Sequence, residues 1–82
     1  PKCTVEIFGN GMEYDLTVYA SAFAKSVELS FPGEEVYLDK NYFDITGKAP
    51  TRVRLTTRRM TSLEKLKRIM RIRTVYDLGT EE

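Results

Sequence analysis

Apolar and polar side chains alternate along most of this 82-residue chain, and this period of two constrains the fold more than any other feature. Successive side chains of a β-strand point to opposite faces, so the alternation predicts strands with one buried face. Gly, Pro, Asn and Asp interrupt it about every ten residues, as turns do. The pattern is typical of a β-sandwich of about seven short strands, a single domain over residues 1–82. The predicted strands are residues 3–8, 14–20, 23–31, 36–38, 42–45, 51–57 and 71–76.

Two features predict how the first strands are connected. Gly9-Asn10-Gly11 supplies residues that tolerate a positive φ angle, which favours a tight reversal between the first two strands. Further on, the apolar positions shift by one residue between Ala20 and Phe23. Because a continuous strand keeps its buried face, the shift predicts a turn or bulge there, with Phe23 on the core side of the next strand. Residues 36–38 are expected to form a short edge strand.

One helix is predicted before the last strand. Thr61-Ser62-Leu63-Glu64 has the spacing of a capping box, in which the Thr61 hydroxyl accepts from the amide of Glu64. The apolar residues that follow fall on one helical face, over about two turns. A helix this short is unstable alone, so we expect its apolar face to dock on the sandwich. These residues are Leu63, Leu66, Ile69 and Met70.

Residues able to perform catalysis are scarce. The chain has no His, which excludes Ser-His-Asp and Cys-His triads and imidazole metal sites, and its single Cys3 has no second Cys to pair with. Two adjacent acid pairs, at residues 34–35 and 81–82, lie in a predicted turn and at the end of the chain, where a pocket for catalysis by paired carboxylates is not expected. We therefore expect no catalytic residue, no cofactor and no metal. No run of apolar residues is long enough to predict a membrane span.

Charge is separated along the chain. Residues 1–47 hold three Lys and eight acidic residues, whereas residues 48–82 hold ten Lys or Arg and four acidic residues. A basic nucleic-acid-binding domain is one interpretation. The other is that outward positions of strands and helices are polar in any sandwich. We adopt the second and expect no nucleic-acid partner, because no stacking or groove-reading motif accompanies the charge.

Exposed tyrosines raise the alternative of a carbohydrate-binding module, since aromatic rings stack on sugar faces. Tyr19 and Tyr37 fall on the predicted outer faces and would be the candidates, whereas Tyr14 and Tyr76 share the parity of core positions. The chain has no Trp, and Tyr residues on alternating strands are typical of sheet packing. Carbohydrate binding therefore stays an alternative to a purely structural role.

A polar-aromatic motif, Asp39-Lys40-Asn41-Tyr42-Phe43-Asp44-Ile45, follows the predicted edge strand. Asp and Asn side chains can accept from their own backbone two residues on, so Asp39 and Asn41 predict a local Asx turn. We expect Tyr42 or Phe43 to fill the space between the strands of the sandwich. The candidate structural motif thus comprises Asp39, Asn41, Tyr42, Phe43 and Asp44.

This motif and its setting resemble the C-terminal immunoglobulin-like domain of family 2 glycoside hydrolases, above all the β-mannosidase-like members. The family pattern is Ser-Asp-Asn-Tyr-Phe-Asp-Leu, from which Lys40 departs. The segment from Ala24 through Val27 to Leu29 and the ending at residues 72–77 are also similar to the family. The turn at residues 46–50 departs from it, because the family continues with Pro-Gly-Glu.

The resemblance implies an immunoglobulin-like β-sandwich without catalytic function, a C-terminal fragment of a larger enzyme. The parent would be a retaining exo-β-glycosidase such as a β-mannosidase, with β-galactosidase or β-glucuronidase as alternatives. Its partners would be the other domains of that enzyme, with carbohydrate bound only by the parent and no membrane involved. The compartment stays open, with a secreted or periplasmic parent as one option. The candidate interdomain interface is basic and comprises Arg52, Arg54, Arg58, Arg59 and Arg73.

Overall fold

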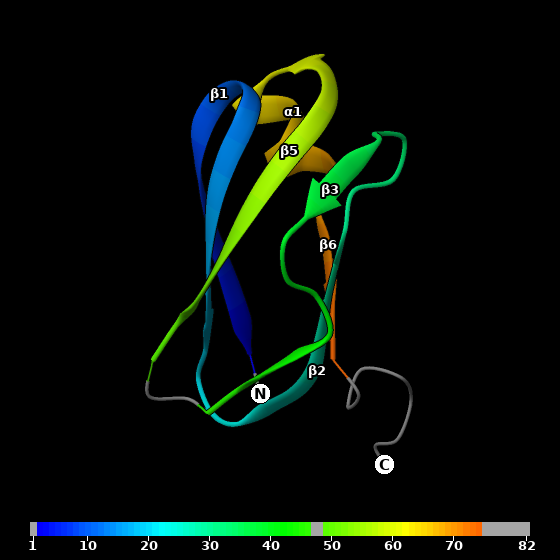
Figure 1. Cartoon of the computed structure of the whole chain (residues 1–82). Helices are drawn as coiled ribbons and strands as arrows, with labels where there is room; N and C mark the ends of the chain where they lie inside the picture. The colour runs from blue at the N-terminus through cyan, green and yellow to red at the C-terminus, as the bar shows by residue number, and fades with distance from the viewer. Residues whose placement is uncertain (1, 47–48, 75–82) are drawn as a thin grey trace.

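The computed structural model describes residues 2–46 and 49–74 and consists mainly of β-strands (Figure 1). Three strands form a first antiparallel sheet in the order β1-β5-β3, and three form a second in the order β4-β2-β6. One short helix precedes the last described strand. The expected immunoglobulin-like β-sandwich is therefore confirmed. The elements are β1 Cys3–Ala20, β2 Ala24–Ser30, β3 Val36–Leu38, β4 Phe43–Ile45, β5 Thr51–Thr61, α1 Leu63–Ile69 and β6 Arg71–Arg73.

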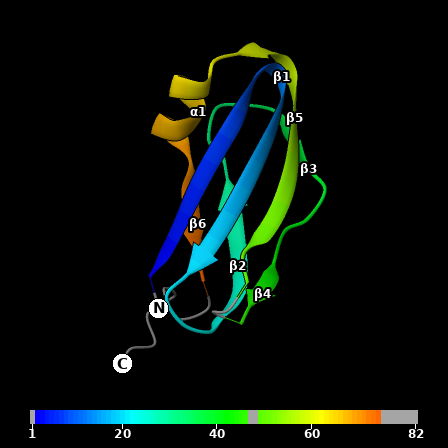
Figure 2. The same ribbon diagram turned by 90° about the vertical axis from the view of Figure 1, so that its left-hand side faces the viewer.

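Strand β1 folds back on itself and supplies two of the predicted strands, as Figure 2 shows. Its two ends meet, because the amide of Ser21 donates to the carbonyl of Lys2 over 2.9 Å. The reversal lies at the expected place, where Gly9 has a φ of +134° and Gly11 a φ of +69°. A Cβ at Gly9 would collide with the carbonyl oxygen of Glu13, so both the dihedral angle and the close approach require glycine there.

The predicted break between Ala20 and Phe23 is confirmed, and strand β2 contains a second irregularity. The chain bends at residues 21–22, and the register of β2 against β4 then shifts between Ala24 and Val27, where Ser26 has a φ of 54°. This bulge lets Ala24 and Val27 both face the core. Phe23, which we expected on the core side, is 47% exposed. That expectation was wrong because the extra residue lies inside β2 and not only before it.

The helix begins one residue later than the capping box predicts. Thr61 is still paired with Gly11 at the end of β5, so it is a strand residue and not the N-cap. Ser62 is the N-cap, and its hydroxyl oxygen accepts from the amide of Lys65 over 3.1 Å. The predicted cap at Thr61 with Glu64 was therefore wrong. The apolar face of α1 docks as expected, with Leu66 fully buried.

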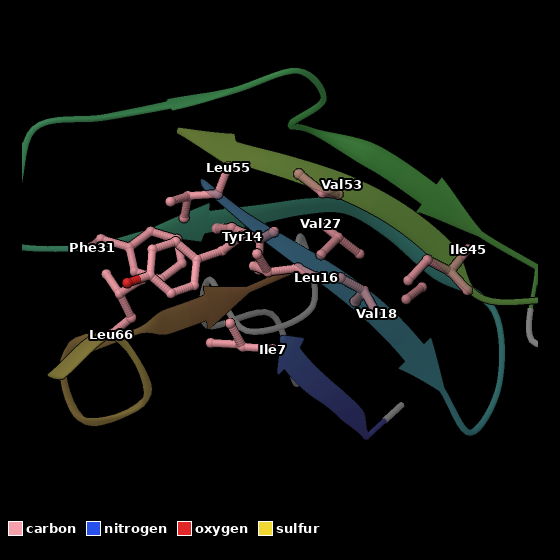
Figure 3. Packing of buried hydrophobic residues seen from close by; sticks show 12 residues of the cluster. Ile7, Tyr14, Leu16, Val18, Val27, Phe31, Ile45, Val53, Leu55 and Leu66 are labelled. Atoms are coloured by element: carbon pink, nitrogen blue, oxygen red, sulfur yellow. The ribbon is translucent and has the colours of Figure 1, made fainter. Parts of the chain in front are cut away.

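The core lies between the two sheets and is closed at one end by α1. Figure 3 shows Leu66 of the helix packed beside Phe31 and Tyr14. The Tyr14 hydroxyl donates to the carbonyls of Gly11 at 3.0 Å and Thr61 at 3.1 Å, so this buried tyrosine links the β1 reversal to the end of β5. The core consists of Ile7, Tyr14, Leu16, Val18, Ala24, Val27, Leu29, Phe31, Ile45, Val53, Leu55 and Leu66.

The remaining strands agree with the sequence in position but differ in length. β3 lies at the edge of its sheet, as expected, and β5 is longer than predicted because it continues to Thr61. β6 covers Arg71–Arg73, and the part of the predicted last strand beyond residue 74, including Tyr76, lies outside the described residues. Within the described ranges, no helix combines the length and the apolar character needed to span a membrane.

Candidate functional site

Asn41 lies between β3 and β4, and its side chain is bonded to the backbone of β2. Its Oδ1 accepts from the amide of Leu29 over 2.8 Å, and its Nδ2 donates to the carbonyl of the same residue over 3.0 Å. The same Oδ1 accepts from the amide of Tyr42 over 3.1 Å. Since Val27 pairs with Phe43 in the β2–β4 ladder, the Asn41 side chain continues that ladder by one step beyond the end of β4.

The two aspartates of the motif also bond to other strands. Asp39 Oδ1 accepts from the amide of Arg54 in β5 over 2.8 Å, and its own amide donates to the carbonyl of Arg54 over 3.1 Å. Asp44 Oδ1 accepts from the amide of Ser26, at the bulge of β2, over 2.8 Å. The expected local Asx turn was therefore wrong. Residues 39–44 connect the two sheets, because Asp39 bonds to the first and Asn41 to the second.

The two aromatic residues of the motif have different surroundings. Phe43 is partly buried and packs against the core, as we expected of one of the two. Tyr42 is 67% exposed and has a φ of 57°, a left-handed conformation that aromatic residues rarely adopt. Its hydroxyl donates to Glu28 Oε2 over 3.1 Å. This hydrogen bond and the negative charge of Glu28 raise the pKa of Tyr42 above its usual value.

Two of the nominated arginines are paired with acidic side chains of the same domain. Arg54 on β5 faces β1, where its Nε contacts Asp15 Oδ1 at 2.7 Å and its Nη1 lies 3.7 Å from Glu13. The hydrogen bond to Asp15 raises the pKa of Arg54 above its usual value. Arg58 Nε lies 3.4 Å from Glu35. All these side chains are exposed, so solvent screens each pair and the pairs add little to the stability of the domain.

The five nominated arginines are not on one face of the molecule. Arg52, Arg54 and Arg58 alternate with buried residues along β5 and lie on the outer face of the first sheet. Arg73 belongs to β6 of the second sheet, where it pairs in register with Glu28. Arg59 is exposed near the end of β5. Within residues 2–46 and 49–74, Arg52, Arg59 and Arg73 form no ion pair.

An open groove of about 760 Å³ runs between the edges of the two sheets. One side is formed by the end of β2 and the other by β3 and the middle of β5. Tyr37 lines it and is 68% exposed. Tyr19, the other tyrosine nominated for sugar binding, is exposed on β1, where its hydroxyl donates to Glu6 at 3.2 Å. Tyr14 is buried as expected. No local sequence pattern indicates the groove, because segments far apart in the chain form it.

One known protein family matches the sequence of this sandwich. A family model described as the mannosidase Ig-fold domain (Ig_mannosidase) matches residues 1–78. Because the match covers nearly the whole sequence, the chain belongs to this family of Ig-fold accessory domains. A search of curated proteins found no match. In the described part of the chain, no group of three or more His, Cys, Asp or Glu residues could hold a metal ion.

Proposed function

We propose that this chain is a structural, non-catalytic domain of a larger family 2 type glycoside hydrolase. The observation that carries the proposal is the match to the mannosidase Ig-fold family over residues 1–78. The parent enzyme is a retaining exo-β-glycosidase, a β-mannosidase in the first instance, with its catalytic carboxylates in another domain. The hydrogen bonds of the motif side chains support this structural role, because Asp39, Asn41 and Asp44 all bond to the backbone of other strands.

The domain contributes by packing against its neighbours in the parent enzyme. Arg54 and Arg58 already have acidic partners within the domain. Arg52, Arg59 and Arg73 are the nominated arginines whose charge is available to carboxylates of an adjoining domain. The carbohydrate substrate meets the parent enzyme and not this sandwich.

The test requires the full-length chain, the isolated domain and a chain from which the domain is deleted. We expect the full-length protein to hydrolyse a β-mannoside with retention and the isolated domain to hydrolyse none. Deletion of the domain should lower the thermal unfolding midpoint of the remainder. Hydrolysis by the isolated domain, or an unchanged midpoint after deletion, would overturn the proposal.

Carbohydrate binding is a second candidate because Tyr37 presents an exposed ring at a groove. If the groove were a sugar site, calorimetric titration with mannose or its β-linked oligomers would give saturable binding that Tyr37→Ala abolishes. Tyr19→Ala is the matched control, since Tyr19 is exposed on the same sheet but does not line the groove. The structural role predicts no saturable binding at millimolar sugar.

A further inference from the structure

The outer face of the second sheet carries an exposed aromatic residue in a strained backbone conformation. Tyr42 has a φ of 57°, where Gly or Asn is far more common than a bulky residue. Its ring is 67% exposed, so burial in this domain does not offset the strain. Backbone strain of this kind is frequently found at binding sites. Packing within the isolated sandwich therefore does not explain why an aromatic residue occupies this position.

The backbone around Tyr42 is firmly held. Asn41 bonds to both backbone groups of Leu29, and Asp44 bonds to the amide of Ser26, so the residues on both sides of Tyr42 are attached to β2. The Tyr42 hydroxyl is itself fixed by Glu28. An exposed side chain held in one position loses little conformational entropy when a partner covers it.

Charge on this face is open to a partner. Arg73 pairs in register with Glu28 across β6 and β2, and it lies near enough to Tyr42 for its charge to act on the phenol. Among the described residues, neither Arg73 nor Glu28 forms an ion pair. The outer face of the first sheet differs, because Arg54 there is paired with Asp15 and Glu13. The positive charge of Arg73, which has no ion-pair partner within residues 2–46 and 49–74, suits a carboxylate.

We propose that Tyr42, Glu28 and Arg73 form the docking surface for an adjoining protein domain of the same polypeptide. The Tyr42 ring packs against an apolar side chain of that domain, and Arg73 receives a carboxylate from it. Tyr and Arg are enriched among the residues that dominate protein interfaces. This inference rests on the proposed function, in which the chain is one domain of a larger enzyme, and it identifies the face that meets the neighbour.

The experiment introduces Tyr42→Asn into the full-length polypeptide. Asn accepts a left-handed φ but provides no ring, so the variant relieves strain while it removes the anchor. Tyr37→Asn is the control, because Tyr37 is equally exposed on the other sheet. We measure the rate of limited proteolysis between this domain and its neighbour, together with the unfolding midpoint of the 82-residue chain.

We expect Tyr42→Asn to accelerate interdomain cleavage about tenfold, as loss of an interface anchor does, with Tyr37→Asn unchanged. The 82-residue chain carrying Tyr42→Asn should unfold at the same midpoint as the wild type or a higher one, because the relief of strain offsets the loss of the exposed hydrogen bond to Glu28. A lower midpoint would show that the ring stabilises the sandwich itself and would overturn the inference. Tyr42→Phe, which keeps the ring, should cleave at nearly the wild-type rate.

Charge reversal provides a second, independent comparison. Arg73→Glu should accelerate cleavage severalfold, whereas Arg58→Glu on the first sheet, where Arg58 already has Glu35 as a partner, should not. Equal rates for Tyr42→Asn, Arg73→Glu and wild type would overturn this docking surface. If deletion of the domain still destabilised the remainder, the accessory function would stand and the contact would lie on another face.

Discussion

Asn41→Ala should be among the most destabilising substitutions at a side chain outside the core. The change removes both hydrogen bonds to the backbone of Leu29 and the one from the amide of Tyr42. An unpaired buried backbone group costs about 1–3 kcal/mol. Because the two Leu29 bonds are part-buried and water can reach some of the freed groups, we expect a loss of about 2–4 kcal/mol. That loss is large against the roughly 4–12 kcal/mol typical of a domain this size.

The assay is urea denaturation of the 82-residue chain, followed by circular dichroism because the chain has no Trp. Lys40→Ala is the matched control: the residue is adjacent and exposed, and its replacement should change the free energy of unfolding by less than about 0.5 kcal/mol. Thermal unfolding should agree, since a domain of this size loses roughly 4–8 °C per kcal/mol. If Asn41→Ala unfolded at the same urea concentration as Lys40→Ala, the interpretation of Asn41 as a link between β4 and β2 would be refuted.

Three further predictions concern the helix and a tyrosine. Ser62→Ala should lower the free energy of unfolding by about 0.5–2 kcal/mol, because the helix loses its N-cap. Thr61→Val should be neutral or stabilising by about 1 kcal/mol, because the buried Thr61 hydroxyl has no hydrogen-bond partner in the described part of the chain. Urea denaturation compares the two variants. Leu66→Ala should cost about 2–5 kcal/mol by the same assay, and a loss below 1 kcal/mol would contradict its place in the core. The pKa of Tyr42 should fall in Glu28→Gln, because the hydrogen bond to the Glu28 carboxylate and its negative charge both raise it, and ultraviolet titration would show the change. Because the folded pKa is the higher one, the stabilisation from this tyrosine is present at neutral pH and is lost as the pH rises through that pKa.

The strands and most of the core residues could be predicted from the sequence, because the alternation of apolar and polar side chains along a strand is enough to show which side chains are buried. Tyr14, Leu16 and Val18 occupy alternate positions, and all three are buried. The same alternation places Arg52 and Arg54 on the outside of β5. The spacing of apolar residues is sufficient here, since each strand has one face toward the other sheet.

Positions that depend on partners from distant parts of the chain did not follow from the sequence. A capping box is a local pattern, and it favours Thr61, which has the acidic Glu64 three residues on, over Ser62, which has Lys65 there. The choice between them depends on Gly11, fifty residues earlier, which keeps Thr61 in the sheet. The division of the arginines between two faces depends in the same way on the pairing of β6 with β2. Local patterns do not contain this information.

The motif at residues 39–44 can be recognised in the sequence, but the hydrogen-bond partners of its side chains were predicted wrongly, for a physical reason. Asp and Asn can bond to the nearest backbone amides, and that local use is the one a sequence suggests. In this sandwich β3 and β4 have only three residues each, so few backbone hydrogen bonds attach them to their sheets. Side chains supply the missing bonds: Asp39 to β5 and Asn41 to β2. Because these polar groups bond within the domain, the exposed Tyr42 between them is the motif residue most available to a partner.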